Sequence, residues 1–151
     1  MLALLIQGLV LVAVGFQDDA TAATKAEMQA LQGSWLGTGF EIGGQSAPLD
    51  FVAKGRYVFE GPKLAVYEGD KLVARAQVVV YPDASPKGID LLAEEGGKPT
   101  GQKVEGIYEI KDGNLKLCFP TGPGAQRPTE FTSKGKAGLM TFKHAPPPDG
   151  K

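Results

Sequence analysis

The chain has 151 residues, of which 42% are hydrophobic and 22% charged, a balance typical of one globular domain and not of a disordered chain. Its formal net charge is −1, and its lysines are scattered singly among expected turns instead of forming a basic stripe. These properties exclude nucleic acid and strong electrostatic attachment to a membrane surface from the expected partners.

The chain begins with an apolar run, MLALLIQGLVLVAVGF, interrupted only by Gln7. This run is short for a membrane span, and the small-residue pattern Ala20-Thr21-Ala22 follows it, so we interpret residues 1–22 as an export signal. Ala13-Val14-Gly15 is a competing cleavage point. Retention of residues 1–16 as a membrane anchor is the alternative. The signal predicts an exported protein, either periplasmic or extracellular.

Residues 23–30 are expected to form a short helical lead-in, because TKAEMQALQ contains helix-forming residues. The first expected strand, GSWLGTGFEI, holds the single tryptophan, Trp35. If this strand alternates regularly, Trp35 and Glu41 face inward while Phe40 and Ile42 point away. Its internal glycines have two interpretations: they leave interior space, or they let the strand bend. The next stretch, SAPLDFVAKG, is expected to be an irregular or short helical crossing.

A short internal repeat follows. The hexapeptide FEGPKL is echoed eight residues later by YEGDKL, with a glycine in each expected turn. This spacing predicts consecutive hairpins formed by strands RYVFE, KLAVYE and KLVARAQVVVY.

The second half continues the pattern of strands and turns. KGIDLLAEE is an expected strand and GGKPTGQ an expected loop. VEGIYEI and LKLCFP flank Lys111-Asp112-Gly113-Asn114, a strong hairpin signal. GPGAQR is an expected loop, PTEFTS and LMTFKH are the last expected strands, and residues 145–151 form a proline-rich tail. Residues 31–144 are thus predicted to be an all-β domain, an up-and-down antiparallel barrel of eight or nine strands. A β-sandwich is the structural alternative.

The tripeptide Gly33-Ser34-Trp35 matches the Gly-x-Trp of the first strand in lipocalins and fatty-acid-binding proteins. With LQGSW, YVFEGPKL, GIYEIKDGNLKLCF and RPTEFTSKGKAG, residues 31–143 resemble an uncharacterised, lipocalin-like exported domain family known mainly from planctomycetes. The resemblance implies a calycin-type barrel and a location in the cell envelope. It implies no activity.

The sequence shows no catalytic constellation, so we expect a protein that is not an enzyme and that uses no cofactor and no metal. The single histidine, His144, and the single cysteine, Cys118, are too few for a zinc site. We expect His144 to be exposed. A lone cysteine also excludes an internal disulfide, and we expect Cys118 to be a buried small hydrophobe, with a bridge to another chain as the alternative.

Aromatic residues of the expected strands are candidates for lining a ligand site, because apolar sites are commonly lined by aromatic rings. These candidates are Trp35, Tyr57, Phe59, Tyr67, Tyr108 and Phe131. Ordinary core packing is the alternative for each of them.

Arg127 has two interpretations. In lipocalins an arginine from a late strand commonly packs across the first-strand tryptophan, so the resemblance implies that Arg127 and Trp35 close one end of the barrel. The alternative is a surface pair between Arg127 and Glu130.

Two functions are therefore predicted. The first is a small exported binding module that holds an apolar or amphipathic small ligand in the barrel. The alternative is a solid-cored structural or protein-interaction domain that contacts an envelope protein through its loops or a sheet edge.

Overall fold

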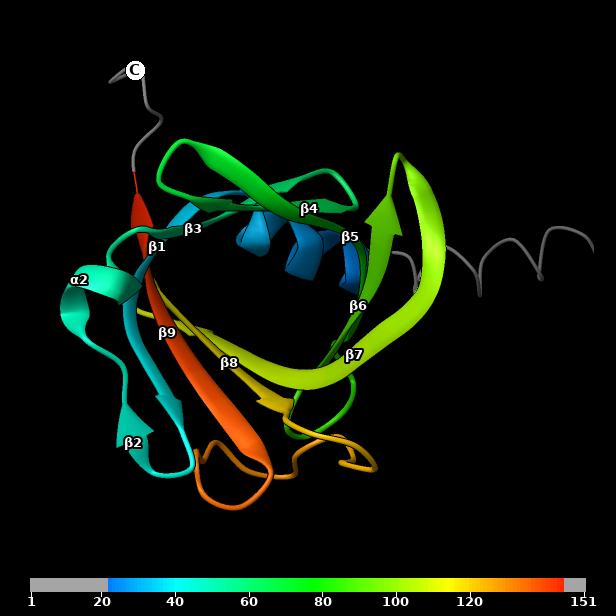
Figure 1. Ribbon diagram of the computed structural model, residues 1–151. Helices are drawn as coiled ribbons and strands as arrows, with labels where there is room; N and C mark the ends of the chain where they lie inside the picture. Colours follow the sequence, from blue (N-terminus) through cyan, green and yellow to red (C-terminus); the bar gives the residue numbers. More distant parts are fainter. Residues whose placement is uncertain (1–21, 146–151) are drawn as a thin grey trace, which may run out of the picture.

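Eight antiparallel strands close into an up-and-down barrel in the computed structural model, which describes residues 22–145 (Figure 1). Each strand pairs with the next in the chain, and pairing between the first and last strands closes the barrel. A ninth strand, β2, extends only β1. The predicted barrel is confirmed and the sandwich is wrong. The strands are β1 (Gly33–Ile42), β2 (Gln45–Ser46), β3 (Gly55–Glu60), β4 (Lys63–Glu68), β5 (Lys71–Tyr81), β6 (Gly88–Glu95), β7 (Lys98–Lys111), β8 (Asn114–Pro120) and β9 (Ala137–Ala145).

The hairpin turns follow from local residue chemistry. In the β7–β8 turn, Asp112 has φ 55° and Gly113 has φ 77°. Such a pair of positive φ values matches the right-handed twist of the flanking strands, and Asp-Gly adopts it readily. The repeated Glu-Gly pairs also lie at turns, between β3 and β4 and between β4 and β5, as their spacing predicts.

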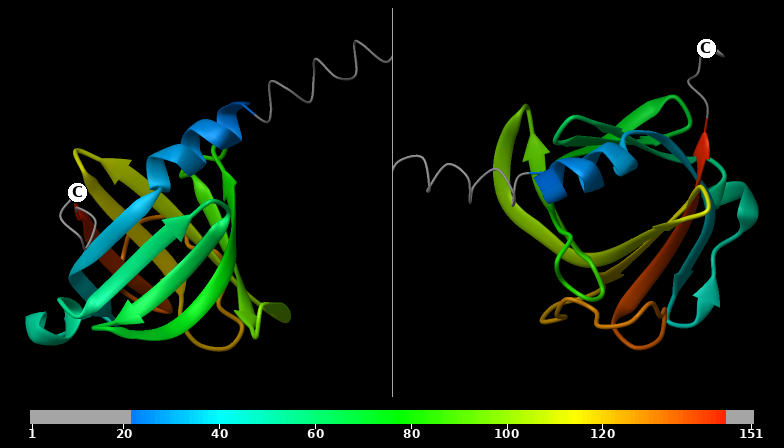
Figure 2. Two further views of the ribbon diagram at one scale, coloured as in Figure 1. Left: turned by 90° about the horizontal axis from the view of Figure 1, so that it is seen from above. Right: turned by 180° about the vertical axis from the view of Figure 1, so that it is seen from behind.

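A helix covers one end of the barrel. Residues 22–31 are helical, as expected for the lead-in, and they lie across that end in Figure 2. The side chain of Leu31 is completely buried against the interior, together with Trp35, which is 2% exposed. We call this end the closed end. The short helix α2 (Leu49–Val52) lies beside β1 (Figure 1).

Strand β1 does not alternate regularly. Its pairing with β9 shifts register between Gly37 and Gly39, so Thr38 is an extra residue, a β-bulge. After the bulge, Phe40 pairs with Met140, which packs on the inner core, so Phe40 faces inward. The prediction that Phe40 and Ile42 point away was wrong, because one inserted residue exchanges the two faces of a strand. The bend interpretation of the glycines agrees with the bulge.

The loop between β8 and β9, residues 121–136, lies over the outer face of the sheet. It covers a second apolar cluster that is separate from the barrel interior, made of Ile107, Cys118 and Ala137 with Phe131 and Leu139 packed against it. The expected strand PTEFTS lies in this loop and is not a strand. The prediction was wrong because the closed barrel leaves no free edge for it to pair with. The expected loop GGKPTGQ was also wrong, because only Gly96 and Gly97 form the turn and β7 begins at Lys98.

Candidate functional site

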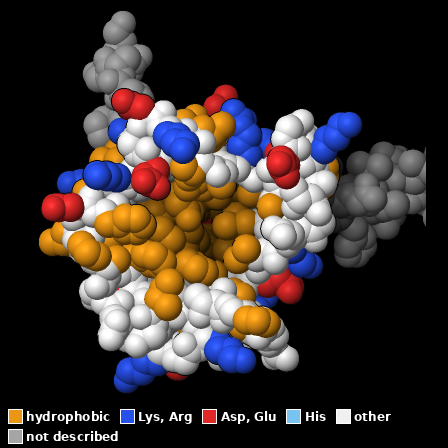
Figure 3. Space-filling view, viewed as in Figure 1, with side chains coloured by type: hydrophobic (Ala, Val, Ile, Leu, Met, Phe, Trp, Pro, Cys, Tyr) orange, Lys and Arg blue, Asp and Glu red, His pale blue; other side chains and the backbone are white. Residues whose placement is uncertain are grey.

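The end of the barrel opposite the helix is hollowed and lined by hydrophobic side chains (Figure 3). Here apolar residues of the inner face stay in contact with solvent, as shown by Val104, which is 40% exposed, and Ile42, which is 46% exposed. At the closed end, inward-facing Leu115 and Phe142 are completely buried. The interior is therefore solid at one end and open at the other. We call the open part the hollow; its lining includes Phe40, Ile42, Leu91, Val104, Phe119 and Met140.

Cross-strand pairing assigns these side chains to the inner face, since directly paired residues share a face of the sheet. Val104 pairs with Leu91, which packs on the inner core. The rings of Phe40 and Phe119 stack over β9 at one side of the mouth, with their centroids 6.4 Å apart.

A small apolar pocket extends the hollow into its wall. It has a volume of about 20 Å³, room for roughly one water molecule. No charged side chain lines it, and its lining residues are Ile89, Leu91, Val104, Gly106, Ile107, Leu117, Cys118 and Phe119. Larger depressions lie elsewhere on the described part, and the lining of those of about 410 and 710 Å³ includes charged residues such as Glu109 and Arg75. Between residues 22 and 145, no group of three or more potential metal ligands comes together.

Tyr57 lies at the floor of the hollow. Its ring packs on Phe142, with centroids 4.7 Å apart, and its hydroxyl lies 3.6 Å from the sulfur of Met140. A thioether is a weak acceptor. Burial raises the pKa of the Tyr57 phenol, so the group is an uncharged hydrogen-bond donor at any ordinary pH.

The predicted ligand-lining residues divide into three groups. Three of them, Trp35, Phe59 and Tyr108, belong to the solid core. Tyr57 packs against this core, on the side that faces the hollow. Tyr67 pairs with Arg56 on the outer face, next to the inward-facing Val66. For Tyr67 the prediction was wrong, because alternation along β4 sends its ring outward.

Phe131 also lies outside the barrel. It belongs to the loop between β8 and β9 and packs on the outer cluster, with the ammonium of Lys116 5.5 Å from its ring centroid. The prediction that Phe131 lines a ligand site was wrong for the same reason as the strand PTEFTS, since this segment covers the sheet instead of joining it. Cys118 is completely buried beneath the same loop, as expected. Its thiol donates to the carbonyl oxygen of Thr132 at 3.2 Å.

Polar contacts fasten the helix to the closed end. The indole N–H of Trp35 donates to the carbonyl oxygen of Leu31 at 2.7 Å, and the hydroxyl of Tyr108 donates to Glu27 at 2.6 Å. Lys87 lies 3.1 Å from the same carboxylate. Burial raises the pKa of Glu27, but the hydrogen bonds from Tyr108 and Lys87 outweigh it, so the pKa lies below its ordinary value.

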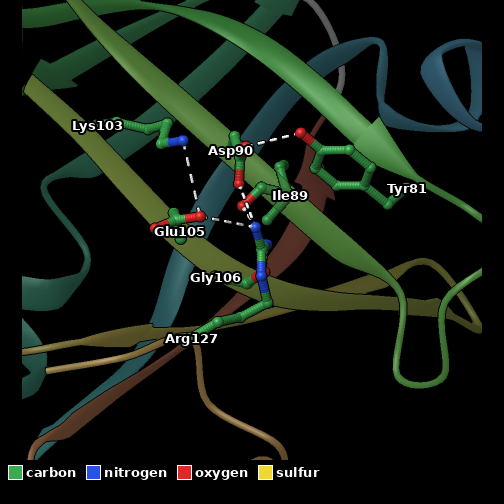
Figure 4. Close-up of polar contacts among 7 residues, drawn as sticks. All are labelled: Tyr81, Ile89, Asp90, Lys103, Glu105, Gly106 and Arg127. Atoms are coloured by element: carbon green, nitrogen blue, oxygen red, sulfur yellow. Dashed lines mark hydrogen bonds and ion pairs between the residues drawn. The ribbon is translucent and has the colours of Figure 1, made fainter. Parts of the chain in front are cut away.

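The ring that covers Trp35 is that of His144. The two rings meet edge to face with centroids 4.8 Å apart, and His144 is exposed, as expected. Arg127 lies elsewhere, on the outer face of the sheet (Figure 4). The prediction that Arg127 closes the barrel over Trp35 was wrong.

Arg127 instead fastens the long loop to β6 and β7. Its guanidinium donates to the carboxylate of Asp90 and to the carbonyl oxygen of Gly106, both at 2.7 Å (Figure 4). Glu105 accepts a longer bond of 3.3 Å, and the ring of Tyr81 lies 5.4 Å from the guanidinium carbon. The alternative pair with Glu130 was wrong too, because these partners occupy the guanidinium.

Several residues that line the hollow were not predicted from the sequence. Phe40 and Ile42 were assigned to the wrong face because the glycines on both sides of Thr38 indicate a bend but do not show that it inserts a residue. Val104 and Met140 lie in predicted strands, and alternation from the neighbouring Tyr108 and Phe142 could have placed them inside.

No protein-family model, no curated protein and no solved structure matches this chain. The resemblance to the lipocalin-like planctomycete family therefore stays a prediction, while the eight-stranded antiparallel barrel is observed directly. The predicted export signal, residues 1–22, lies outside the described part except for residue 22. The predicted proline-rich tail, residues 145–151, lies outside it except for residue 145. Within residues 22–145, no helix is long and apolar enough to cross a membrane.

Proposed function

We propose that this protein is a small exported binding module that holds an apolar or amphipathic small ligand in the hollow. The observation that carries the proposal is the contrast between the two ends of one interior. Apolar walls exposed to water are unfavourable by about 25 cal/mol per Å² relative to burial, so a ligand that covers them gains that free energy. A barrel of eight strands has the width to hold one small ligand.

The ligand would enter from the open end, because the helix closes the other. Leu31 fills the closed end, and the contacts of Trp35 and Tyr108 with the helix hold it in place. Trp35 therefore lies in the solid half, and its emission is an indirect reporter of binding. A ligand that is itself fluorescent is the better probe.

The test is titration with N-phenyl-1-naphthylamine, an uncharged apolar dye whose emission rises on transfer from water to an apolar site. The variant Val104→Phe adds bulk inside the hollow, and we expect it to weaken dye binding at least severalfold. The matched control is Val79→Phe, because Val79 is 37% exposed on a strand whose neighbours Val78 and Val80 face inward. Val79→Phe should bind like the wild-type protein.

Absence of saturable binding by the wild-type protein would overturn the proposal. Equal weakening by both variants would also contradict it, since the effect would then not come from the hollow. Circular dichroism and urea unfolding of both variants would show that each remains folded.

The alternative, a protein-interaction domain, is favoured by one observation. Helix α2 exposes Leu49 by 73% and Phe51 by 54%, more than any other large hydrophobic side chains in the described part. If an envelope protein binds there, Leu49→Ser with Phe51→Ser should abolish that association and leave dye binding unchanged. Loss of dye binding in this double variant would instead assign the two side chains to the mouth of the hollow.

The proposed location outside the cytoplasm is supported by the apolar run and the small residues that follow it. Mass measurement of the protein recovered from the cell envelope or medium tests it. A mature chain beginning near residue 23 is expected. Recovery of the full-length chain from the membrane fraction would favour the anchor.

A further inference from the structure

We infer that the hollow selects an uncharged ligand carrying a hydrogen-bond acceptor, and that the hydroxyl of Tyr57 donates a hydrogen bond to this acceptor at the floor. This inference rests on the proposed function and adds the chemical class of the ligand. Two independent observations carry it: the charge of the lining and the state of the tyrosine hydroxyl.

The first observation concerns charge. No Lys, Arg, His, Asp or Glu lines the apolar pocket that extends the hollow. On β7 and β8 the charged side chains lie on the opposite face, as the cross-strand pair of Glu109 and Lys116 shows beside inward-facing Tyr108 and Leu117. At the mouth, Glu41 accepts a hydrogen bond at 3.1 Å from Ser133 of the outer loop.

The consequence is that a charged group entering the hollow finds no counter-charge. Transfer of an unpaired carboxylate or ammonium from water to an apolar site is strongly unfavourable. Glu68 shares the inward face of β4 with Val66, but it is exposed and pairs with Lys71 beside the β4–β5 turn, so these two charged groups lie at the rim and not at the floor. An anionic ligand can therefore bind only with its charge held at the mouth.

The second observation concerns the hydroxyl of Tyr57. It contacts only the sulfur of Met140 among the polar contacts of the described residues, at 3.6 Å. The hydroxyl of the other deeply placed tyrosine, Tyr108, already donates its proton to the carboxylate of Glu27 at 2.6 Å. A carbonyl or ether oxygen is a stronger acceptor than a thioether, so a ligand oxygen at the floor would replace the weak contact by a stronger one.

Three probes of similar shape separate these effects: 2-acetylnaphthalene, 2-ethylnaphthalene and 2-naphthoate, each titrated by calorimetry. All three share the same fused rings. The first carries a ketone, the second an ethyl group with no hydrogen-bond acceptor, and the third a carboxylate. We expect the ketone to bind about two- to tenfold more tightly than the hydrocarbon, the range of one net hydrogen bond, and the carboxylate to bind most weakly.

The variant Tyr57→Phe should remove the preference for the ketone over the hydrocarbon and leave binding of the hydrocarbon unchanged. Tyr67→Phe is the matched control, because it makes the same substitution on the outer face of the neighbouring strand. It should keep the preference.

The outcomes separate the two proposals. If all probes bind but Tyr57→Phe keeps the ketone preference, or if 2-naphthoate binds as tightly as the ketone, the selectivity for uncharged acceptors is overturned and the binding function stands. If no probe binds the wild-type protein, both proposals fall.

Discussion

The contact between Arg127 and Asp90 gives the sharpest test of how the long loop is held. We consider Arg127→Met, which removes the guanidinium but keeps much of the side-chain stem for packing. The substitution leaves the carboxylate of Asp90, only 5% exposed, with the hydroxyl of Tyr81 as its remaining side-chain partner at 2.8 Å.

The expected magnitude lies between two limits. Breaking a fully buried ion pair costs about 3–5 kcal/mol, and an exposed pair contributes about 0–1 kcal/mol. The side chain of Arg127 is 31% exposed, and Asp90 keeps one hydrogen bond, so we expect Arg127→Met to lower the free energy of unfolding by about 2 kcal/mol. The double variant with Asp90→Asn should lose less than the sum of the two single variants, because the two side chains act on each other.

Urea unfolding followed by Trp35 emission measures this effect. The control is Arg75→Met, since Arg75 is exposed on β5, and its cost should stay within about 0.5 kcal/mol. In the folded Arg127→Met variant, the emission maximum of Trp35 should not move, because His144 covers the indole. A loss below about 0.5 kcal/mol would refute the buried-pair reasoning. A shifted maximum in the folded state would show that the guanidinium reaches the tryptophan after all.

Three further predictions concern other contacts. Because the pKa of Glu27 is lower in the folded protein than in the unfolded chain, its carboxylate contributes stability that is fully present above the unfolded pKa. This contribution is lost as the pH falls through the folded pKa. Glu27→Gln should therefore flatten the acid side of a plot of unfolding free energy against pH, and an unchanged slope would contradict this. Burial raises the pKa of the Cys118 thiol and shields it from solvent. A chromogenic disulfide reagent should therefore react slowly with the native protein and at once in denaturant. Equal reaction rates in the two states would contradict the burial. Gly37→Ala would place a Cβ 2.5 Å from the carbonyl oxygen of Val52, so we expect the free energy of unfolding in urea to fall by about 1–3 kcal/mol. An unchanged unfolding midpoint would show that α2 shifts without loss of stability.

Features that depend on local residue order could be predicted from the sequence. Strand β4 begins and ends, and β5 begins, where the repeated Glu-Gly turns place them, because a positive φ is needed at a tight hairpin and glycine supplies it. The burial of Cys118 also follows from its residue type, since a free cysteine behaves as a small hydrophobe.

Features that depend on the path of a long loop could not be predicted. Arg127 and Phe131 lie in the loop that follows β8, and nothing in their own segment says which face of the sheet this loop covers. The sequence shows an arginine and an aromatic ring in a strand-like run, and both suit the barrel interior. Because β1 pairs with β9, the sheet has no free edge with which this loop could pair as a strand. The apolar side chains of the loop therefore pack on the outer face of the sheet.

The bulge at Thr38 determines whether the hollow is apolar. If β1 alternated without it, Glu41 would point into the mouth, and Phe40 and Ile42 would lie outside. The inserted residue reverses this order, so Phe40 stacks on Phe119 inside while Glu41 bonds to Ser133 outside. A carboxylate inside would repel anionic groups and favour a cationic ligand, whereas its absence leaves Tyr57 as the polar group at the floor. One residue in the first strand thus sets the expected ligand chemistry. This explains why the strand and turn signals predicted the barrel while the alternation rule misassigned the residues of its mouth.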